Sequence, residues 1–149
     1  MHVLERSVAL PVARSKLFPF FADARNLERL TPPSLRFEIL TPGEIRMEAG
    51  ATIDYRLRVS GFPVRWRTVI KVWEPPLRFV DVQTKGPYAL WRHTHTFQET
   101  PQGTMMRDRV EYALPFGPLG ELAHRLFVAR QLERIFSFRA RVVAEMFPA

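Results

Sequence analysis

Residues 91–114 read WRHTHTFQETPQGTMMRDRVEYAL, and this stretch decides the fold. In its middle, Thr100-Pro101-Gln102-Gly103 suits a type I turn, with proline at the second position and glycine at the fourth. Residues two apart on a strand share a face, so the stretch predicts an antiparallel hairpin with one buried face. The members of that face are Trp91, His93, His95 and Phe97 before the turn, and Met106, Asp108, Val110, Tyr112 and Leu114 after it.

The turn also sets the register of this hairpin. Pairing Glu99 with Thr104 across the turn places His95 opposite Asp108. A slip of one residue would put the two apolar faces on opposite sides of the sheet, whereas a slip of two would bring His93 or Phe97 opposite Asp108. Directly opposed residues have Cβ atoms roughly 4.5–5.5 Å apart, which is within reach of a hydrogen bond between imidazole and carboxylate. We therefore predict a His–Asp pair on the buried face.

Alternation of apolar and charged residues continues upstream of the hairpin, and glycine and proline separate the runs. The expected strands before the hairpin are residues 2–10, 35–39, 53–59, 64–72 and 79–83. Together with the hairpin they make about seven strands. Their short connections favour antiparallel neighbours.

Helical spacing occupies two segments. Pro19 interrupts residues 15–30, which predicts two short helices, the second from about Asp23 to Leu30. Pro118 suits the first turn of a long helix over about residues 119–147. The apolar stripe of that helix is Leu119, Leu122, Leu126, Leu132, Ile135, Phe136, Val142, Val143 and Phe147. Arginines on the remaining face are Arg125, Arg130, Arg134, Arg139 and Arg141.

This order of elements predicts an α+β fold. A single curved antiparallel sheet of about seven strands buries its inner face by wrapping around the long C-terminal helix, with two short helices after the first strand. A helix that covers only part of the sheet leaves room for a cavity. The 149 residues show no repeat or linker, so we expect one domain, residues 1–149.

Composition excludes several kinds of protein. The chain has no cysteine, so it forms no disulfide and offers no thiolate as nucleophile or metal ligand. Glu5 and Arg6 lie within the first apolar stretch, which argues against a signal peptide, and we expect a cytoplasmic protein. The net charge of +7 comes mostly from arginines that alternate with apolar residues on strands. Without a recognition-helix motif this charge predicts no nucleic-acid binding, and it leaves an anionic membrane surface as a less favoured partner.

Five stretches over nearly the whole chain are similar to one known family. They are residues 20–33 (FFADARNLERLTPP), 79–83 (FVDVQ) with Gly86-Pro87-Tyr88, 91–97, 108–112 and 114–120 (LPFGPLG). They resemble the START-like (SRPBCC) superfamily, and more closely its bacterial polyketide cyclase/dehydrase-like branch. The resemblance implies a helix-grip fold with a deep cavity. Members bind lipids, sterols, polyketides, hormones or quinones, and a minority catalyse cyclisation or dehydration.

The polar groups of the hairpin, His93, His95 and Asp108, admit three roles. They can satisfy one another's hydrogen bonds, anchor a polar atom of a ligand, or act as an acid–base pair in which Asp108 orients an imidazole. His-x-His on a strand can also supply two metal ligands, but no third ligand stands at a typical spacing. We therefore predict no metal and no other cofactor.

The candidate ligand-binding residues are the aromatic and polar groups expected on the inner face. They are Tyr55, Trp66, Asp81, Gln83, Trp91, His93, His95, Phe97, Asp108 and Tyr112. Asp81 and Gln83 are included because the resemblance implies them. Tyr55, Trp66 and Tyr112 are aromatic residues that more often pack a core than contact a ligand.

Three functions follow from these features. The leading one is binding of a small, largely hydrophobic ligand such as a lipid, polyketide or quinone. The first alternative is a cyclase or dehydratase that uses His93 or His95 with Asp108. The second is a lipid or quinone carrier whose basic helix contacts a membrane, although solvation and pairing with glutamates explain that face more simply. Those glutamates are Glu121, Glu133 and Glu145.

Overall fold

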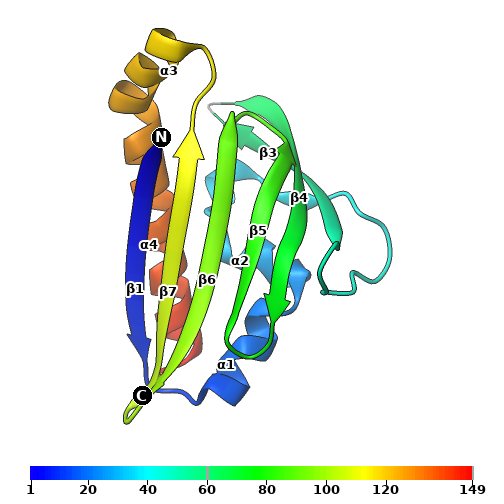
Figure 1. The fold of residues 1–149 in the computed structure, drawn as a ribbon, viewed down its shortest axis with the longest axis vertical. Coiled ribbons are helices and arrows are strands. Elements are labelled where there is room, and N and C mark those ends of the chain that lie inside the picture. Colours follow the sequence, from blue (N-terminus) through cyan, green and yellow to red (C-terminus); the bar gives the residue numbers. More distant parts are fainter. Residues whose placement is uncertain (60, 149) are drawn as a thin grey trace.

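A curved sheet of seven antiparallel strands forms one layer of the molecule, and the C-terminal helix lies against its inner face (Figure 1). The computed structural model describes residues 1–59 and 61–148. The strands lie in the order β1-β7-β6-β5-β4-β3-β2 across the sheet. Their bounds are β1 (His2–Leu10), β2 (Glu38–Ile39), β3 (Thr52–Val59), β4 (Phe62–Glu74), β5 (Arg78–Lys85), β6 (Leu90–Thr100) and β7 (Gly103–Ala113).

Helices follow the first and the last strand, as the sequence predicts. After β1 come α1 (Arg14–Phe21), the 3₁₀ turn η1 (Ala24–Asn26), α2 (Leu27–Leu30) and the 3₁₀ turn η2 (Pro33–Leu35). After β7 come α3 (Gly117–Ala123), the π-helical turn η3 (His124–Val128) and α4 (Ala129–Met146). In Figure 1, α4 runs behind β1 and β7, whereas α1 and α2 lie beside the strands of the other half of the sheet. The α+β helix-grip prediction is confirmed.

The two short helices expected over residues 15–30 are present, and Pro19 lies inside the first of them, where it removes only the hydrogen bond to the carbonyl of Ser15. One local prediction is wrong. The strand expected over residues 35–39 is reduced to Glu38–Ile39. Arg36 has a left-handed backbone (φ 47°) and ends the 3₁₀ turn, so regular pairing begins only after it.

The predicted register of the hairpin is confirmed. Glu99 pairs with Thr104, His95 lies opposite Asp108, and every residue of β6 from Leu90 to Thr100 has its partner on β7. The buried faces of both strands point to the same side, where they pack against α4. Because a one-residue slip would expose this face, the apolar pattern and the turn together fix the alignment.

The first part of the long helix does not pack as the apolar stripe predicts. Leu119, Leu122 and Leu126 are exposed, with 73%, 50% and 56% of their surface accessible. The π-helical turn η3 adds a residue to one helical turn and so rotates the stripe of α3 away from that of α4. Only from Leu132 onward does the stripe face the sheet.

Within residues 1–59 and 61–148, no helix is both long enough and apolar enough to span a bilayer.

Candidate functional site

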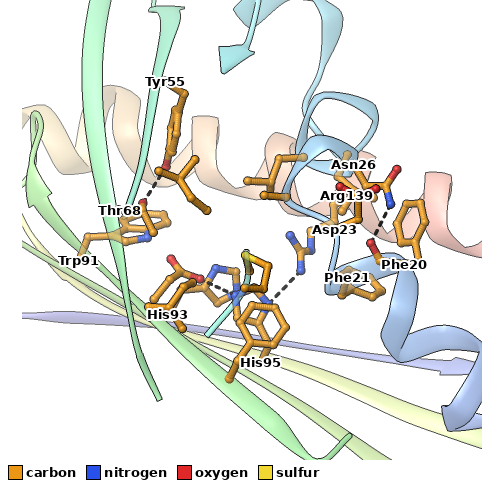
Figure 2. Close-up of a pocket in the computed structure, with 18 residues that line it drawn as sticks. Phe20, Phe21, Asp23, Asn26, Tyr55, Thr68, Trp91, His93, His95 and Arg139 are labelled. Carbon is orange, nitrogen blue, oxygen red and sulfur yellow. Dashed lines mark hydrogen bonds and ion pairs between the residues drawn. The ribbon is translucent and has the colours of Figure 1, made fainter. Parts of the chain in front are cut away.

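Five polar side chains meet on the inner face of the sheet. Asp81 comes from β5, His93 and His95 from β6, Asp108 from β7, and Arg139 from α4. Both histidines, Asp108 and Arg139 are buried, each with at most 7% of its surface accessible. Alternation on the strands aims the first four inward. Arg139 reaches His95 from the opposing helix (Figure 2).

The two histidines form two separate pairs with the two aspartates. Nε2 of His93 lies 2.7 Å from Oδ1 of Asp108, and Nε2 of His95 lies 2.7 Å from Oδ2 of Asp81. The rings stack with centroids 3.6 Å apart. His95 lies opposite Asp108 as predicted, but its Nδ1 is 3.4 Å away, because each imidazole reaches diagonally across the sheet. The His–Asp pair on the hairpin is therefore His93–Asp108.

Arg139 links the two pairs. Its Nη2 lies 3.2 Å from Oδ1 of Asp108 and 3.1 Å from Nδ1 of His95. The expectation that Arg139 lies on the solvent-facing side of the helix is wrong. Arg139 follows Leu132 and Phe136 at helical spacing, so it belongs to the buried stripe. This spacing is the signal that could have identified it.

The charges of the cluster follow from burial and from these contacts. Burial alone would raise the pKa of Asp108, but the charge of Arg139 and the contacts with both histidines hold that pKa well below its usual value. Burial likewise opposes ionisation of Asp81, yet its hydrogen bond to His95 and the charge of Arg139 lower its pKa. Burial and the neighbouring His95 lower the pKa of His93 to about 4. At neutral pH both carboxylates are charged and His93 is neutral.

These contacts also fix which nitrogens carry protons. Neutral His93 donates from Nε2 to Asp108, so its Nδ1 keeps a lone pair, and none of the described residues hydrogen-bonds to that atom. His95 donates from Nε2 to Asp81 and accepts from Arg139 at Nδ1. The pairing thus makes His93 a hydrogen-bond acceptor held in one orientation.

Two adjoining cavities lie between the sheet and the helices. One, of about 110 Å³, contains the polar cluster and is closed on the other side by α1 and α2 (Figure 2). The other, of about 280 Å³, extends toward the end of the sheet where Pro87, Leu114 and Val128 lie. The residues that line both are Leu27, Leu30, Tyr55, Trp91, His93 and Arg139. The combined space is in the range of small-molecule sites, about 300–1,000 Å³.

Most of the predicted ligand-binding residues line these cavities. They are Tyr55, Trp66, Asp81, Trp91, His93 and His95. The hydroxyl of Tyr55 and the indole N–H of Trp66 both bond to the hydroxyl of Thr68, so these aromatics present apolar surface to the cavity.

Four predicted residues lie outside the cavity lining. Asp108 lies behind His93 and Arg139 and contacts the cavity only through these two residues. Gln83 exchanges hydrogen bonds with the backbone of Tyr88, and Phe97 packs in the core beside α1. The hydroxyl of Tyr112 bonds to His124 on the helix.

Pairing of the strands brings a third residue that can bind a metal, Asp81, next to His93 and His95, although the spacing of residues in the sequence did not reveal it. Ligand atoms of Asp81, His93 and His95 all lie within 4.8 Å of one another. Asp81 comes from a neighbouring strand, so its position depends on the pairing of β5 with β6. However, the guanidinium of Arg139 already lies 3.1 Å from His95 and supplies the positive charge at this point. A second cation there would meet electrostatic repulsion.

The family model described as polyketide cyclase / dehydrase and lipid transport matches residues 1–145. The chain belongs to this family. The resemblance seen in the sequence is therefore confirmed. No curated protein matches the sequence.

Several solved structures of low sequence identity share the fold of this chain. The Zhui aromatase/cyclase from Streptomyces sp. R1128 is 13% identical, with a TM-score of 0.76 over 97% of this chain and 92% of that one. A START superfamily protein from Mycobacterium smegmatis is 10% identical, with a TM-score of 0.70 over 98% of this chain and 99% of that one. A protein from Thermus thermophilus is 17% identical, with a TM-score of 0.70 over 98% of both chains.

Identities this low show the fold alone. Family and fold together support a role in binding a hydrophobic ligand or in cyclisation, because the family description covers both. The choice between these roles depends on the chemistry of the cavity in this chain.

Proposed function

We propose that this protein binds a small, largely hydrophobic molecule in the cavity, with one polar atom of the ligand held at His93 and Arg139. The observation that supports this most strongly is the separation of the lining into two parts. Leucines, valines and aromatics line the larger cavity, whereas the charged groups gather at its inner end. A few placed polar groups in an apolar pocket orient a ligand, and the apolar wall supplies most of the affinity.

The polar end favours a ligand oxygen. Nδ1 of His93 accepts a hydrogen bond, and the guanidinium of Arg139 donates them. A hydroxyl can donate to the imidazole, and a hydroxyl or carbonyl oxygen can accept from the guanidinium. Two carboxylates already lie close to the single guanidinium, so an additional anion is disfavoured there. The ligand group is therefore a neutral hydroxyl or carbonyl.

The low pKa of His93 favours binding over acid–base catalysis. A general base works best when its pKa is close to the working pH, and a pKa of about 4 makes His93 a weak base at neutral pH. The cyclase or dehydratase alternative keeps its oriented His93–Asp108 pair. It requires a substrate that raises the pKa of His93 on binding.

Filling the cavity should weaken binding of an apolar probe. Ile135 lines the larger cavity from α4, whereas Ser137 lies on the exposed side of the same helix. We expect Ile135→Trp to weaken binding of 2-naphthol about tenfold or more, because the added ring occupies the probe's volume. Ser137→Trp should leave the affinity unchanged. Isothermal titration calorimetry measures both.

A matched pair of probes tests the polar end separately. Naphthalene has the same rings as 2-naphthol without the hydroxyl. In the unsubstituted protein 2-naphthol should bind more tightly, and His93→Phe should remove most of that preference. The cavity proposal would be contradicted if Ile135→Trp and His93→Phe both bound 2-naphthol and naphthalene as tightly as the unsubstituted protein does. A hydroxyl preference that survives His93→Phe would contradict the role of His93.

Exposed apolar residues around the start of the C-terminal helix favour a second candidate function, carriage of the ligand to or from an anionic membrane. Those with at least half of their surface exposed are Phe116, Leu119, Leu122, Leu126 and Phe127. Leu119 and Leu122 lie in α3, which follows the end of β7 (Figure 1), and the larger cavity extends toward this end, where Leu114 and Val128 line it. Glu121 pairs with His2 of β1, and Glu133 pairs with Arg6 of the same strand. Because these glutamates are paired with β1, the nearby arginines of the helix can attract anionic lipid.

Vesicle flotation distinguishes the carrier from a simple binder. The carrier function predicts that the protein floats with vesicles containing phosphatidylglycerol, and floats less with phosphatidylcholine alone. Replacing Leu126 and Phe127 with serine should abolish flotation. Leu77→Ser, at an exposed apolar residue elsewhere, should not change it. Equal flotation with vesicles that contain phosphatidylglycerol and with vesicles of phosphatidylcholine alone would exclude this second function.

A further inference from the structure

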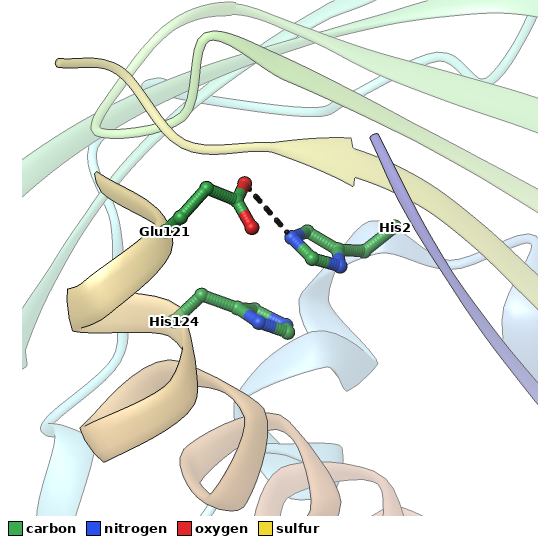
Figure 3. A group of neighbouring side chains, drawn as sticks. All are labelled: His2, Glu121 and His124. Atoms are coloured by element: carbon green, nitrogen blue, oxygen red, sulfur yellow. Dashed lines mark hydrogen bonds and ion pairs between the residues drawn. The ribbon is translucent and has the colours of Figure 1, made fainter. Parts of the chain in front are cut away.

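A second cluster of histidine and carboxylate groups lies away from the cavity, where β1 meets the C-terminal helix. His2 begins β1, and Glu121 and His124 lie three residues apart at the junction of α3 and η3 (Figure 3). Residues three apart on a helix project from the same face. Ligand atoms of the three side chains all lie within 4.8 Å of one another. Three groups that bind metals thus converge from two elements far apart in sequence.

We propose that His2, Glu121 and His124 bind a transition metal ion of the zinc type. Two imidazole nitrogens and one carboxylate oxygen form a donor set found in zinc sites that keep a fourth position for water. Imidazole suits zinc and its neighbours in the first transition row, whereas calcium and magnesium prefer oxygen ligands throughout. The residue types therefore select the class of ion.

The geometry is close to that of such a site. Nε2 of His2 lies 3.1 Å from Oε1 of Glu121, near the roughly 3.3 Å that separates ligand atoms around a tetrahedral ion at about 2.0 Å. The rings of His2 and His124 stack with centroids 3.6 Å apart. Because an imidazole lone pair lies in the plane of its ring, one ring must tilt to share the ion. Both histidines are only half-buried, so this tilt displaces no core residue.

Tyr112 holds one of the proposed ligands in place. Its hydroxyl lies 2.8 Å from Nε2 of His124, so it can accept a hydrogen bond from the Nε2–H group and leave Nδ1 as the metal ligand. Tyr112 also pairs with His2 in the β1–β7 ladder. A hydrogen bond between a buried residue and the second nitrogen of a ligating histidine is a supporting arrangement typical of metal sites.

The surroundings favour a cation here more than at the central cluster. Among the described residues, Glu121 forms an ion pair with His2 alone, so no arginine or lysine neutralises its charge. At the central cluster, Arg139 already supplies that charge. His124 is also the first residue of η3, and π-helical turns recur at functional sites. A bound ion would tie β1 to the segment that contributes Val128 to the larger cavity.

The test is titration of the untagged, EDTA-treated chain with Zn²⁺ in the calorimeter, and with Co²⁺ followed by visible absorption. We expect one ion per chain and the absorption bands of a tetrahedral Co²⁺ site. His2→Asn and Glu121→Gln should each weaken the affinity about tenfold or more, and Tyr112→Phe should weaken it less. Thermal unfolding in EDTA checks that each variant folds.

Two control variants keep the outcome decisive. Glu133→Gln removes another glutamate that joins the C-terminal helix to β1 and should leave Zn²⁺ affinity unchanged. His93→Gln removes a ligand of the central cluster and should also leave it unchanged. The proposal is overturned if no saturable one-to-one binding occurs, or if His2→Asn and Glu121→Gln bind as the unsubstituted chain does. Loss of binding in His93→Gln alone would also overturn it.

Discussion

Replacing Arg139 with methionine should lower the free energy of unfolding by about 3–5 kcal/mol. Methionine keeps much of the side-chain volume, so the loss comes mainly from the missing charge. Asp108 would remain buried without the guanidinium that now lies 3.2 Å from its Oδ1. A buried charge that loses its partner costs far more than a surface pair does. Urea unfolding at neutral pH measures the change.

Arg134→Met is the matched control because Arg134 lies on the exposed side of the same helix. It should change stability by no more than about 0.5 kcal/mol. Adding Asp108→Asn to Arg139→Met should recover part of the loss, since the uncompensated charge is then removed. If Arg139→Met costs no more than Arg134→Met, the guanidinium does not stabilise the buried carboxylates, and the account of the cluster is wrong.

Stability should fall by about 3 kcal/mol as the pH is lowered from 6.5 to 4, because His93 is neutral when folded. Its pKa is about 4 in the folded chain against 6.5 for an unperturbed histidine, and each unit corresponds to about 1.4 kcal/mol. Below pH 6.5 the unfolded chain binds a proton at this residue that the folded chain does not. Its contribution is therefore complete above pH 6.5 and is lost as the pH falls toward 4.

His93→Gln isolates this contribution. The variant should show a flatter stability profile between pH 6.5 and 4 than the unsubstituted chain, and the difference between the two profiles is the measurement. Partial burial and His2 also lower the pKa of His124, but that effect is common to both proteins and cancels. Asp81 and Asp108 act at lower pH, where their stabilisation is lost as they become protonated. Profiles that coincide would contradict the assignment of a neutral His93.

The hairpin and the order of elements could be predicted because their signals are local. The turn at Thr100–Gly103 and the alternation on both sides of it allow only one register that buries a single face. The long helix and the short helices follow from spacing and proline in the same way. These features need no knowledge of which distant segments meet.

The polar cluster could be predicted only in part because its pairing is set by distant segments. His95 lies opposite Asp108 in the ladder, yet it bonds to Asp81 on the other neighbouring strand. Which aspartate each histidine bonds depends on how the two stacked imidazole rings are oriented relative to β5 and β7. The exposure of Leu119 and Leu126 depends likewise on the π-helical turn, which no local pattern in the sequence indicates.

A crystal structure of the protein with 2-naphthol tests the central claim most directly. The proposed function predicts electron density for the two rings between the sheet and α4, with the hydroxyl within hydrogen-bond distance of Nδ1 of His93 or of the Arg139 guanidinium. Rings bound outside the cavity, or bound inside with the hydroxyl turned away from His93 and Arg139, would contradict it.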